Sequence, residues 1–171
     1  MRIRRAEIGD ALAVATVHVR SWQAAFAGQV PQDHLDGLRP EDRREQWEDI
    51  LASADWPRRG VLVAEDDGVL GFAALSPNRD GDADPAAVGE IAALYLSPGV
   101  WGRGIGGRLM TESLALFREA GFPLATLWVL DTNERARRFY EACGWRADGA
   151  VKLDDSLGAP LKELRYARAV P

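Results

Sequence analysis

Apolar residues recur along the chain with two different spacings, and these divide it into predicted strands and helices. Short apolar or alternating runs predict β-strands at 2–7, 61–65, 69–75, 87–96, 124–130, 145–153 and 161–170. Apolar positions three or four residues apart predict α-helices at about 11–26, 39–53, 104–120 and 133–143, with a short helical turn within 28–38. With the long helices counted, the order β-α-α-β-β-β-α-β-α-β-β predicts a mixed α/β domain around one sheet.

Local signals mark the ends of these elements. Asp10 stands where it can cap the first helix, and Gly121 and Gly144 follow the ends of the last two helices. The triplet 66–68, Asp-Asp-Gly, separates two apolar runs and predicts a β-hairpin, whereas the polar segment 76–85 predicts a loop. Both alternating sets of residues in 87–96 are apolar, so we expect a central strand that is buried on both faces.

Composition narrows the class of protein without naming a function. The chain has 171 residues, 47% of them hydrophobic and 27% charged, which suits a single globular domain spanning 1–171. Its 26 acidic and 21 basic residues give a net charge of −5, which does not favour a nucleic-acid partner.

The cysteine and histidine content and the apolar runs exclude several features. The single cysteine, Cys143, permits no disulfide within the chain, and no apolar run is long enough for a membrane span. We therefore expect a cytoplasmic protein. We expect no metal site, because His18, His34 and Cys143 show no ligand spacing.

The loop SPGVWGRGIGG at 97–107 follows a predicted strand, precedes a predicted helix and contains four glycines within six residues. Its G-x-G-x-x-G pattern at 102–107 suggests a dinucleotide-binding turn. However, too few residues follow for the further parallel βα units of such a fold, and Asp131 lies beyond the usual spacing of about 20 residues for the ribose-binding acid. A P-loop does not fit, because Ile105-Gly106 stands where Lys-Ser or Lys-Thr is required.

Two interpretations of the glycines are left. A purely structural turn would rarely need all four, since a glycine within a helix costs roughly 0.5–1 kcal/mol relative to alanine. A pyrophosphate cradle at a helix N-terminus needs them, because bare backbone lets N–H groups approach the phosphate closely. Arg103 and Arg108 would add positive charge at the rim of such a cradle.

Two ordered motifs give the chain a family resemblance. Residues 101–106 match the pattern Gln/Arg-x-x-Gly-x-Gly/Ala, except that Trp101 stands in the Gln/Arg position. About 30 residues later, Asn133 precedes a helix that ends in Phe139-Tyr140-Glu141, and Gly144-Trp145 follows. This combination resembles the GCN5-related N-acetyltransferases, the GNAT superfamily, most strongly over 87–146. The predicted order of elements is similar to that fold, which has a mostly antiparallel central sheet flanked by helices.

The resemblance implies a function and an organisation of the domain. It implies transfer of an acetyl group from acetyl-CoA to a primary amine by direct attack, with 87–146 as the acetyl-CoA-binding core and 1–60 as acceptor-side helices. The acceptor would be a small-molecule or protein amine. A non-catalytic acyl-CoA sensor on the same fold stays open as an alternative, and a dinucleotide-dependent oxidoreductase is a more distant one. Homodimers are common in the family, and the apolar edge of the last strands could support one.

The resemblance also implies roles for particular residues. Tyr140 would lie near the CoA sulfur and protonate the leaving thiolate; alternatively it belongs to an apolar helix stripe with Phe139. Glu90 would take the proton of the amine, with partial burial raising its pKa, or it is a solvent-facing strand residue. His34 and Asp131 are alternative candidates for this base. Residues expected to bind acetyl-CoA are Leu94, Tyr95, Leu96, Trp101, Gly102, Arg103, Gly104, Ile105, Gly106, Gly107, Asn133 and Arg137. Residues expected near the acceptor are Trp22, Phe26 and His34, although Trp22 and Phe26 could equally be core.

Overall fold

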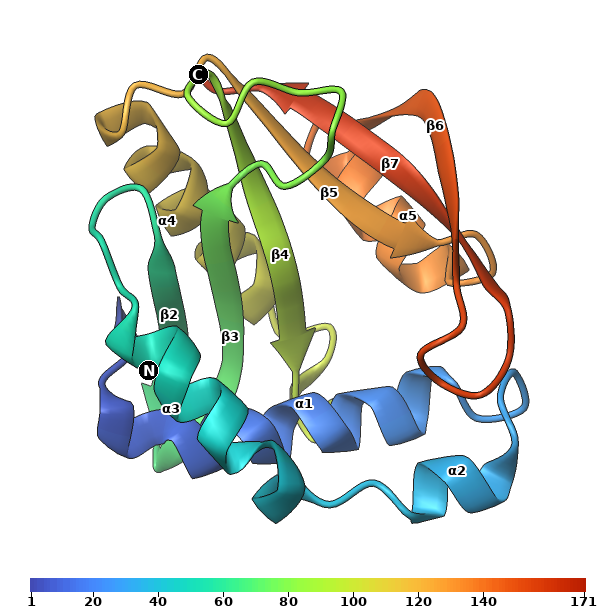
Figure 1. Ribbon diagram of the computed structural model, residues 1–171. Helices are drawn as coiled ribbons and strands as arrows, with labels where there is room; N and C mark the ends of the chain where they lie inside the picture. Colours follow the sequence, from blue (N-terminus) through green and yellow to red (C-terminus); the bar gives the residue numbers. More distant parts are fainter.

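A seven-stranded sheet organises the protein, whose computed structural model describes residues 1–171 (Figure 1). The strand order is β1-β2-β3-β4-β5-β7-β6, and every neighbouring pair is antiparallel except β4 and β5. The strands are β1 Arg2–Arg5, β2 Gly60–Asp66, β3 Gly68–Pro77, β4 Val88–Leu96, β5 Leu124–Leu130, β6 Arg146–Asp154 and β7 Leu161–Ala169. The prediction of a mixed α/β fold with a mostly antiparallel sheet is confirmed. A single parallel pair also excludes a doubly wound dinucleotide fold.

Helices cover both faces of the sheet. The helices are α1 Ala11–Ala25, α2 Gln32–Asp36, α3 Arg44–Ala52, α4 Ile105–Glu119 and α5 Glu134–Ala142. In Figure 1, α1 and α3 lie on one face, whereas α4 and α5 lie on the other. The predicted helix at 39–53 begins instead as a 3-10 turn over Pro40–Arg43, where the proline stands at the first turn. No helix is long and apolar enough to cross a membrane.

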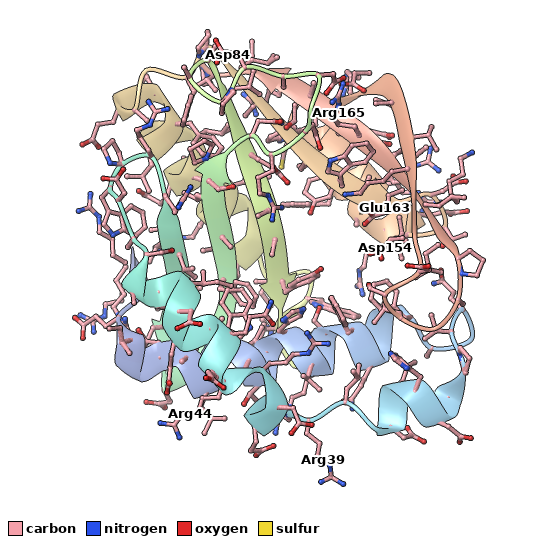
Figure 2. All side chains as sticks on the ribbon, viewed as in Figure 1. Arg39, Arg44, Asp84, Asp154, Glu163 and Arg165 are labelled. Carbon is pink, nitrogen blue, oxygen red and sulfur yellow. The ribbon has the colours of Figure 1, made fainter.

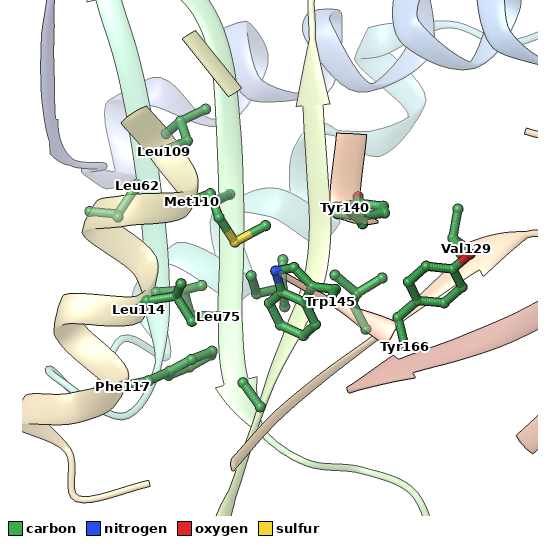
Figure 3. Close-up of a cluster of buried hydrophobic side chains, with 14 of the residues drawn as sticks. Leu62, Leu75, Leu109, Met110, Leu114, Phe117, Val129, Tyr140, Trp145 and Tyr166 are labelled. Atoms are coloured by element: carbon green, nitrogen blue, oxygen red, sulfur yellow. The ribbon is translucent and has the colours of Figure 1, made fainter. Parts of the chain in front are cut away.

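Two hydrophobic clusters fix these layers. On one face, Leu109, Met110, Leu114 and Phe117 of α4 pack against the strands, as Figure 3 shows. On the other face, α1 and α3 pack against β2 and β3, with Trp47 almost fully buried among them. The strands β2 and β3 are thus sandwiched between helices on both faces.

The parallel pair at the centre of the sheet opens along its length. Pairing between β4 and β5 runs only from Val88 to Ile91, and beyond that point the two strands diverge. The register of β4 against β3 shifts at the same place, so that Ala92 is an extra residue in a β-bulge. The expectation that 87–96 is buried on both faces is therefore correct only for Val88–Ile91, since Ala92 is exposed and Ala93–Leu96 are half-buried.

A third hydrophobic cluster closes the diverging end of the gap. Phe26 at the end of α1 packs with Leu35 of α2, Leu130 of β5 and Leu161 of β7. These contacts hold the end of α1 across the mouth of the β4–β5 gap, on the side where the β6–β7 hairpin descends (Figure 1). The gap between β4 and β5 is therefore flanked by the end of α1 on one face of the sheet and by α4 and α5 on the other.

Candidate active site

The gap between β4 and β5 is a cavity of about 400 Å³ that passes from one face of the sheet to the other. On the α4 and α5 face it is lined by the glycine loop and by the start and middle of α5. On the α1 face it is lined by Ser21, Ala25 and Phe26 of α1 together with Trp128, Leu130 and Glu163. Two reactants can therefore meet within the sheet, each entering from a different face.

The exposed edge of β4 forms one wall of the cavity. Backbone N–H groups alternate in direction along a strand, and the N–H of Ser97 donates to the carbonyl of Leu70 on β3. The N–H groups of Leu94 and Leu96 therefore point away from β3 and toward the gap. β5 no longer pairs with β4 there, so this edge offers the cavity strand-type donors and acceptors. An extended ligand can pair with it as an added strand.

The glycine loop forms the floor of the cavity at the N-terminus of α4. Gly102 and Gly104 have φ of 77° and 78°, which an L side chain adopts only with strain. A Cβ on Gly106 would lie 3.2 Å from the ring of Phe139. A Cβ on Gly107 would meet nothing within 4 Å, so the fold itself does not require that glycine. An open surface of this kind over a helix N-terminus fits an approaching anion.

Trp101 takes a defined position in the loop although it departs from the family pattern. Its indole N–H donates to the carbonyl of Leu96 over 3.0 Å, which ties the loop to the end of β4. The guanidinium carbon of Arg135, on α5, lies 4.3 Å from the centre of the Trp101 ring. Both residues line the cavity, so Arg135 supplies a cation at the position where the family pattern has Gln or Arg. Sequence reasoning missed Arg135, because only the fold places α5 beside the loop.

Helix α5 brings Asn133 and Tyr140 to the cavity. The Asn133 side chain accepts a hydrogen bond from the Ala136 N–H over 3.1 Å and so caps the helix. Tyr140 lies two turns later, is only 8% exposed and lines the cavity. Burial raises the pKa of the Tyr140 hydroxyl well above its ordinary value, so this group is protonated at neutral pH. A protonated hydroxyl in this position can donate a proton or a hydrogen bond.

Most of the residues expected to bind acetyl-CoA come together in this cavity. Leu94, Tyr95, Leu96, Trp101, Gly102, Gly104, Ile105, Gly106, Gly107 and Asn133 line it. Arg103 is exposed and does not line it. Arg137 also lies outside, because its guanidinium donates to the carbonyl of Asp131 over 2.9 Å and to the hydroxyl of Tyr166 over 3.2 Å.

Glu90 lies outside the cavity and is engaged elsewhere. Its side chain is 4% exposed, and one carboxylate oxygen accepts a hydrogen bond from the Arg79 guanidinium over 2.7 Å. The other oxygen accepts from the Arg79 backbone N–H over 3.0 Å and from its Nε over 3.2 Å. In this arrangement Glu90 anchors the start of the β3–β4 loop, and it does not line the cavity. Sequence reasoning could not foresee this, since the partner lies in a loop.

Of the residues expected near the acceptor, only Phe26 lines the cavity. Trp22 lies one turn earlier on α1 and packs edge-on against His18, with ring centres 4.3 Å apart. His34 lies on α2, outside the cavity, beside Gly158 of the β6–β7 loop. The aromatic stripe of α1 therefore has one member at the cavity and one within a buried aromatic cluster.

One carboxylate that sequence reasoning missed does line the cavity. Glu163 on β7 is 18% exposed, and its Oε2 lies 3.3 Å from the Lys152 ammonium on the neighbouring strand β6. Burial raises the pKa of Glu163, and the carboxylate of Asp154 raises it further. The sequence carries no signal for it, because Glu163 is one of several charged residues along β7, among them Lys162, Arg165 and Arg168.

No three histidine, cysteine, aspartate or glutamate side chains gather as metal ligands anywhere in the chain. The site therefore consists of backbone amides at a helix N-terminus, an unpaired strand edge, a protonated tyrosine and a partly buried carboxylate. This set is suited to a transferase that holds a phosphate-bearing donor on one face and an acceptor on the other.

Comparisons with known proteins agree that the chain is a transferase. The profile of the acetyltransferase (GNAT) family matches residues 20–145. An uncharacterized N-acetyltransferase of Archaeoglobus fulgidus is 36% identical over 141 residues, which cover 82% of this chain and 89% of that protein. An uncharacterized N-acetyltransferase of Mycobacterium bovis is 37% identical over 147 residues, covering 82% of this chain and 85% of the other.

Solved structures share the fold. The acetyl-CoA complex of YncA from Salmonella typhimurium superposes with a TM-score of 0.72 at 20% identity, over 100% of this chain and 94% of that one. The PaiA N-acetyltransferase of Thermoplasma acidophilum, in complex with coenzyme A, gives 0.69 at 20% identity over 98% of each chain. The chain belongs to the GNAT acetyltransferase family, and the prediction of an N-acetyltransferase is confirmed.

Proposed function

We propose that this N-acetyltransferase binds acetyl-CoA in the β4–β5 cavity and transfers the acetyl group to a primary amine that enters from the α1 face. The observation that carries the proposal is the continuity of the cavity. It runs from the glycine loop, along the unpaired edge of β4, to Tyr140 and through to Glu163. In this arrangement 87–146 is the donor-binding core, and the helices within 1–60 form the acceptor side.

The residues present fit acetyl-CoA. The N–H groups at the start of α4, with Arg135 beside them, suit the pyrophosphate, and Gly107 leaves room for it. The exposed edge of β4 suits the amide groups of pantetheine, which can pair with Leu94 and Leu96 as a strand does. When bound, acetyl-CoA supplies an activated thioester to the cavity.

The chemistry assigned to the chain follows from these positions. The N–H of Leu94 points into the gap and would stabilise the negative charge that develops on the thioester oxygen. Tyr140, which burial keeps protonated at neutral pH, would give its proton to the thiolate as the C–S bond breaks. Direct attack of the amine needs no covalent enzyme intermediate.

Substitution of Tyr140 by phenylalanine tests this role. Tyr140→Phe should lower turnover on the order of 10²-fold, as expected for loss of a general acid, and should leave acetyl-CoA affinity nearly unchanged. Turnover is followed by release of the free thiol and affinity by calorimetry. The matched control is Tyr166→Phe, which removes a buried hydroxyl that bonds Glu141 and Arg137 outside the cavity. Equal turnover in the two variants would contradict the assignment.

Binding of acetyl-CoA without any turnover in the wild type would favour the sensor alternative.

Two further proposals concern the location of the protein in the cell and its oligomeric state. The single, half-buried thiol of Cys143 is consistent with the cytoplasm, where cysteines stay reduced. The edge strand β6 exposes Val151 at 52% and Leu153 at 73%, and a second copy of the chain could cover them in a homodimer. Both stay predictions.

A further inference from the structure

We propose that Glu163 is the general base of the reaction, and that it receives the ammonium group of an acceptor whose remaining part is apolar and uncharged. This inference rests on the proposed function, since it assigns the acceptor half of the same cavity. It replaces Glu90, whose carboxylate is held by Arg79 away from the cavity.

Strand geometry places Glu163 on the acceptor face. Side chains alternate along β7, and Leu164 and Tyr166 belong to the cluster on the α4 and α5 face. Leu161 belongs to the cluster with Phe26 of α1, and Glu163, two residues on, shares its face. The cross-strand neighbour of Glu163 on β5 is Leu130, which lies in that same cluster. Glu163 thus faces the cavity from the side opposite the glycine loop.

The charges around Glu163 favour a cation. Lys152 is its one basic partner, at 3.3 Å, and that ammonium also lies 4.4 Å from the centre of the Trp128 ring. Asp154, near the end of β6, adds a second negative charge, and both carboxylates raise the pKa of Tyr95 on β4, although burial is the larger cause. Figure 2 labels Glu163 and Asp154 where the β6–β7 hairpin descends toward α1. Arg165, two residues on along β7, is paired with Asp80, Asp82 and Asp148, whereas Arg43 acts on Tyr95 in the opposite direction to the two carboxylates. With Arg165 so paired, Glu163 and Asp154 against Lys152 leave a site that a cationic amine can enter.

The surroundings of Glu163 determine what else the acceptor can carry. Phe26, Leu130 and Trp128 line the cavity beside it and are uncharged, and the Lys152 ammonium next to Trp128 is already paired with Glu163. Trp128 is fixed in place, because its indole N–H donates to Asp80 over 3.1 Å and Lys152 lies over its ring. A carboxylate on the acceptor would be repelled by Glu163 and Asp154. An aryl-alkyl or alkyl primary amine therefore fits better than an amino acid.

Burial raises the pKa of Glu163, which makes its carboxylate a stronger base than an exposed glutamate. Glu163 takes one proton from the ammonium, which frees the nitrogen lone pair to attack the thioester carbonyl carbon. A C–N bond forms and the C–S bond then breaks. The thiolate receives a proton from the Tyr140 hydroxyl. The nitrogen loses its second proton, which restores that hydroxyl, and the proton on Glu163 returns to solvent. The products are the acetamide, free CoA thiol and one proton.

The test uses 2-phenylethylamine as the acceptor probe, with thiol release measured across a range of pH. Glu163→Gln should lower kcat/KM for the amine on the order of 10²-fold or more, as expected for loss of a general base, while acetyl-CoA affinity is unchanged. Lys152→Met removes the cation that lowers the pKa of Glu163, so the acid limb of the pH profile should move to higher pH. In the Lys152→Met/Glu163→Gln double variant that shift should be absent, which separates a base from a residue that only shapes the cavity.

The outcomes distinguish this inference from the proposed function. Failure of the wild type to bind acetyl-CoA would refute the proposed function itself. Wild type that binds acetyl-CoA but acetylates spermidine or a peptide N-terminus and not 2-phenylethylamine would overturn the inference alone. The inference would also be overturned if Glu90→Gln removed the acid limb of the pH profile and Glu163→Gln left it in place. Should Glu163→Gln fold poorly, the limb shift in Lys152→Met still decides the question.

Discussion

His18 gives this protein a specific sensitivity to acid. Its imidazole lies on α1 and is 9% exposed, stacked on Tyr95 with ring centres 5.2 Å apart. The Trp47 indole N–H donates to its Nδ1 over 3.3 Å, so the neutral ring carries its proton on Nε2, which has no hydrogen-bond partner. Burial, with Arg43 as a smaller cause, lowers the pKa of His18 from 6.5 to about 4.

The depressed pKa determines the direction and the range of the effect. The unfolded chain binds a proton at His18 below pH 6.5, whereas the folded protein binds it only below about pH 4. The stability contribution is therefore complete above pH 6.5, is lost progressively as pH falls toward 4, and changes no further below that. Between neutral pH and pH 5 the free energy of unfolding should drop by about 2 kcal/mol from this group alone.

The experiment compares the wild type with His18→Asn by urea unfolding, followed by tryptophan fluorescence, near pH 7.5 and near pH 5. Asparagine keeps an acceptor near the position of Nδ1 for Trp47 but does not titrate in this range. The variant should be less stable at both pH values, yet its loss on acidification should be smaller than the wild type's by about 2 kcal/mol. His34→Asn controls for the loss of a histidine outside the core. Equal acid losses in the wild type and His18→Asn, within about 0.5 kcal/mol, would refute the reasoning.

Three further predictions concern the glycine loop and the start of α5. Gly104→Ala should lower the free energy of unfolding by about 1–2 kcal/mol, because its φ of 78° is strained for alanine. Gly107→Ala should raise it by about 0.5 kcal/mol without ligand, yet weaken acetyl-CoA binding in calorimetry; unchanged affinity would contradict a phosphate cradle there. Asn133→Ala should cost about 1 kcal/mol through loss of the helix cap, and Asn133→Asp should retain most of it in thermal unfolding.

Local patterns in the sequence were enough to locate the elements and the glycine loop that lines the cavity. The strands and helices follow from apolar spacing, and their ends follow from Asp66–Gly68, Gly121 and Gly144, because turns and caps act within a few residues. Gly102 and Gly104 indicated a special backbone at the loop, and both take up left-handed φ. Asn133 and Tyr140 are expected at the site from the resemblance to the family motif, and both line the cavity.

The acceptor side could not be predicted in the same way. Phe26 and Trp22 lie one turn apart on the same helix, but the first lines the cavity and the second packs against His18. Periodicity assigns both to an apolar face and cannot separate a cavity wall from a core. The distinction depends on where β5 leaves β4 after Ile91, and on the contacts that hold Phe26 against Leu130 and Leu161 at that opening.

The sequence by itself determined the fold class, and its resemblance to the family indicated the glycine loop and the tyrosine that line the cavity, since each motif depends on residues close together in the chain. Only the tertiary structure decided which carboxylate is available. Arg79, eleven residues before Glu90, occupies both of its oxygens, whereas Glu163 enters the cavity from the last strand. The state of an ionisable group depends on its burial and on its partners, and both are brought to it by distant parts of the chain.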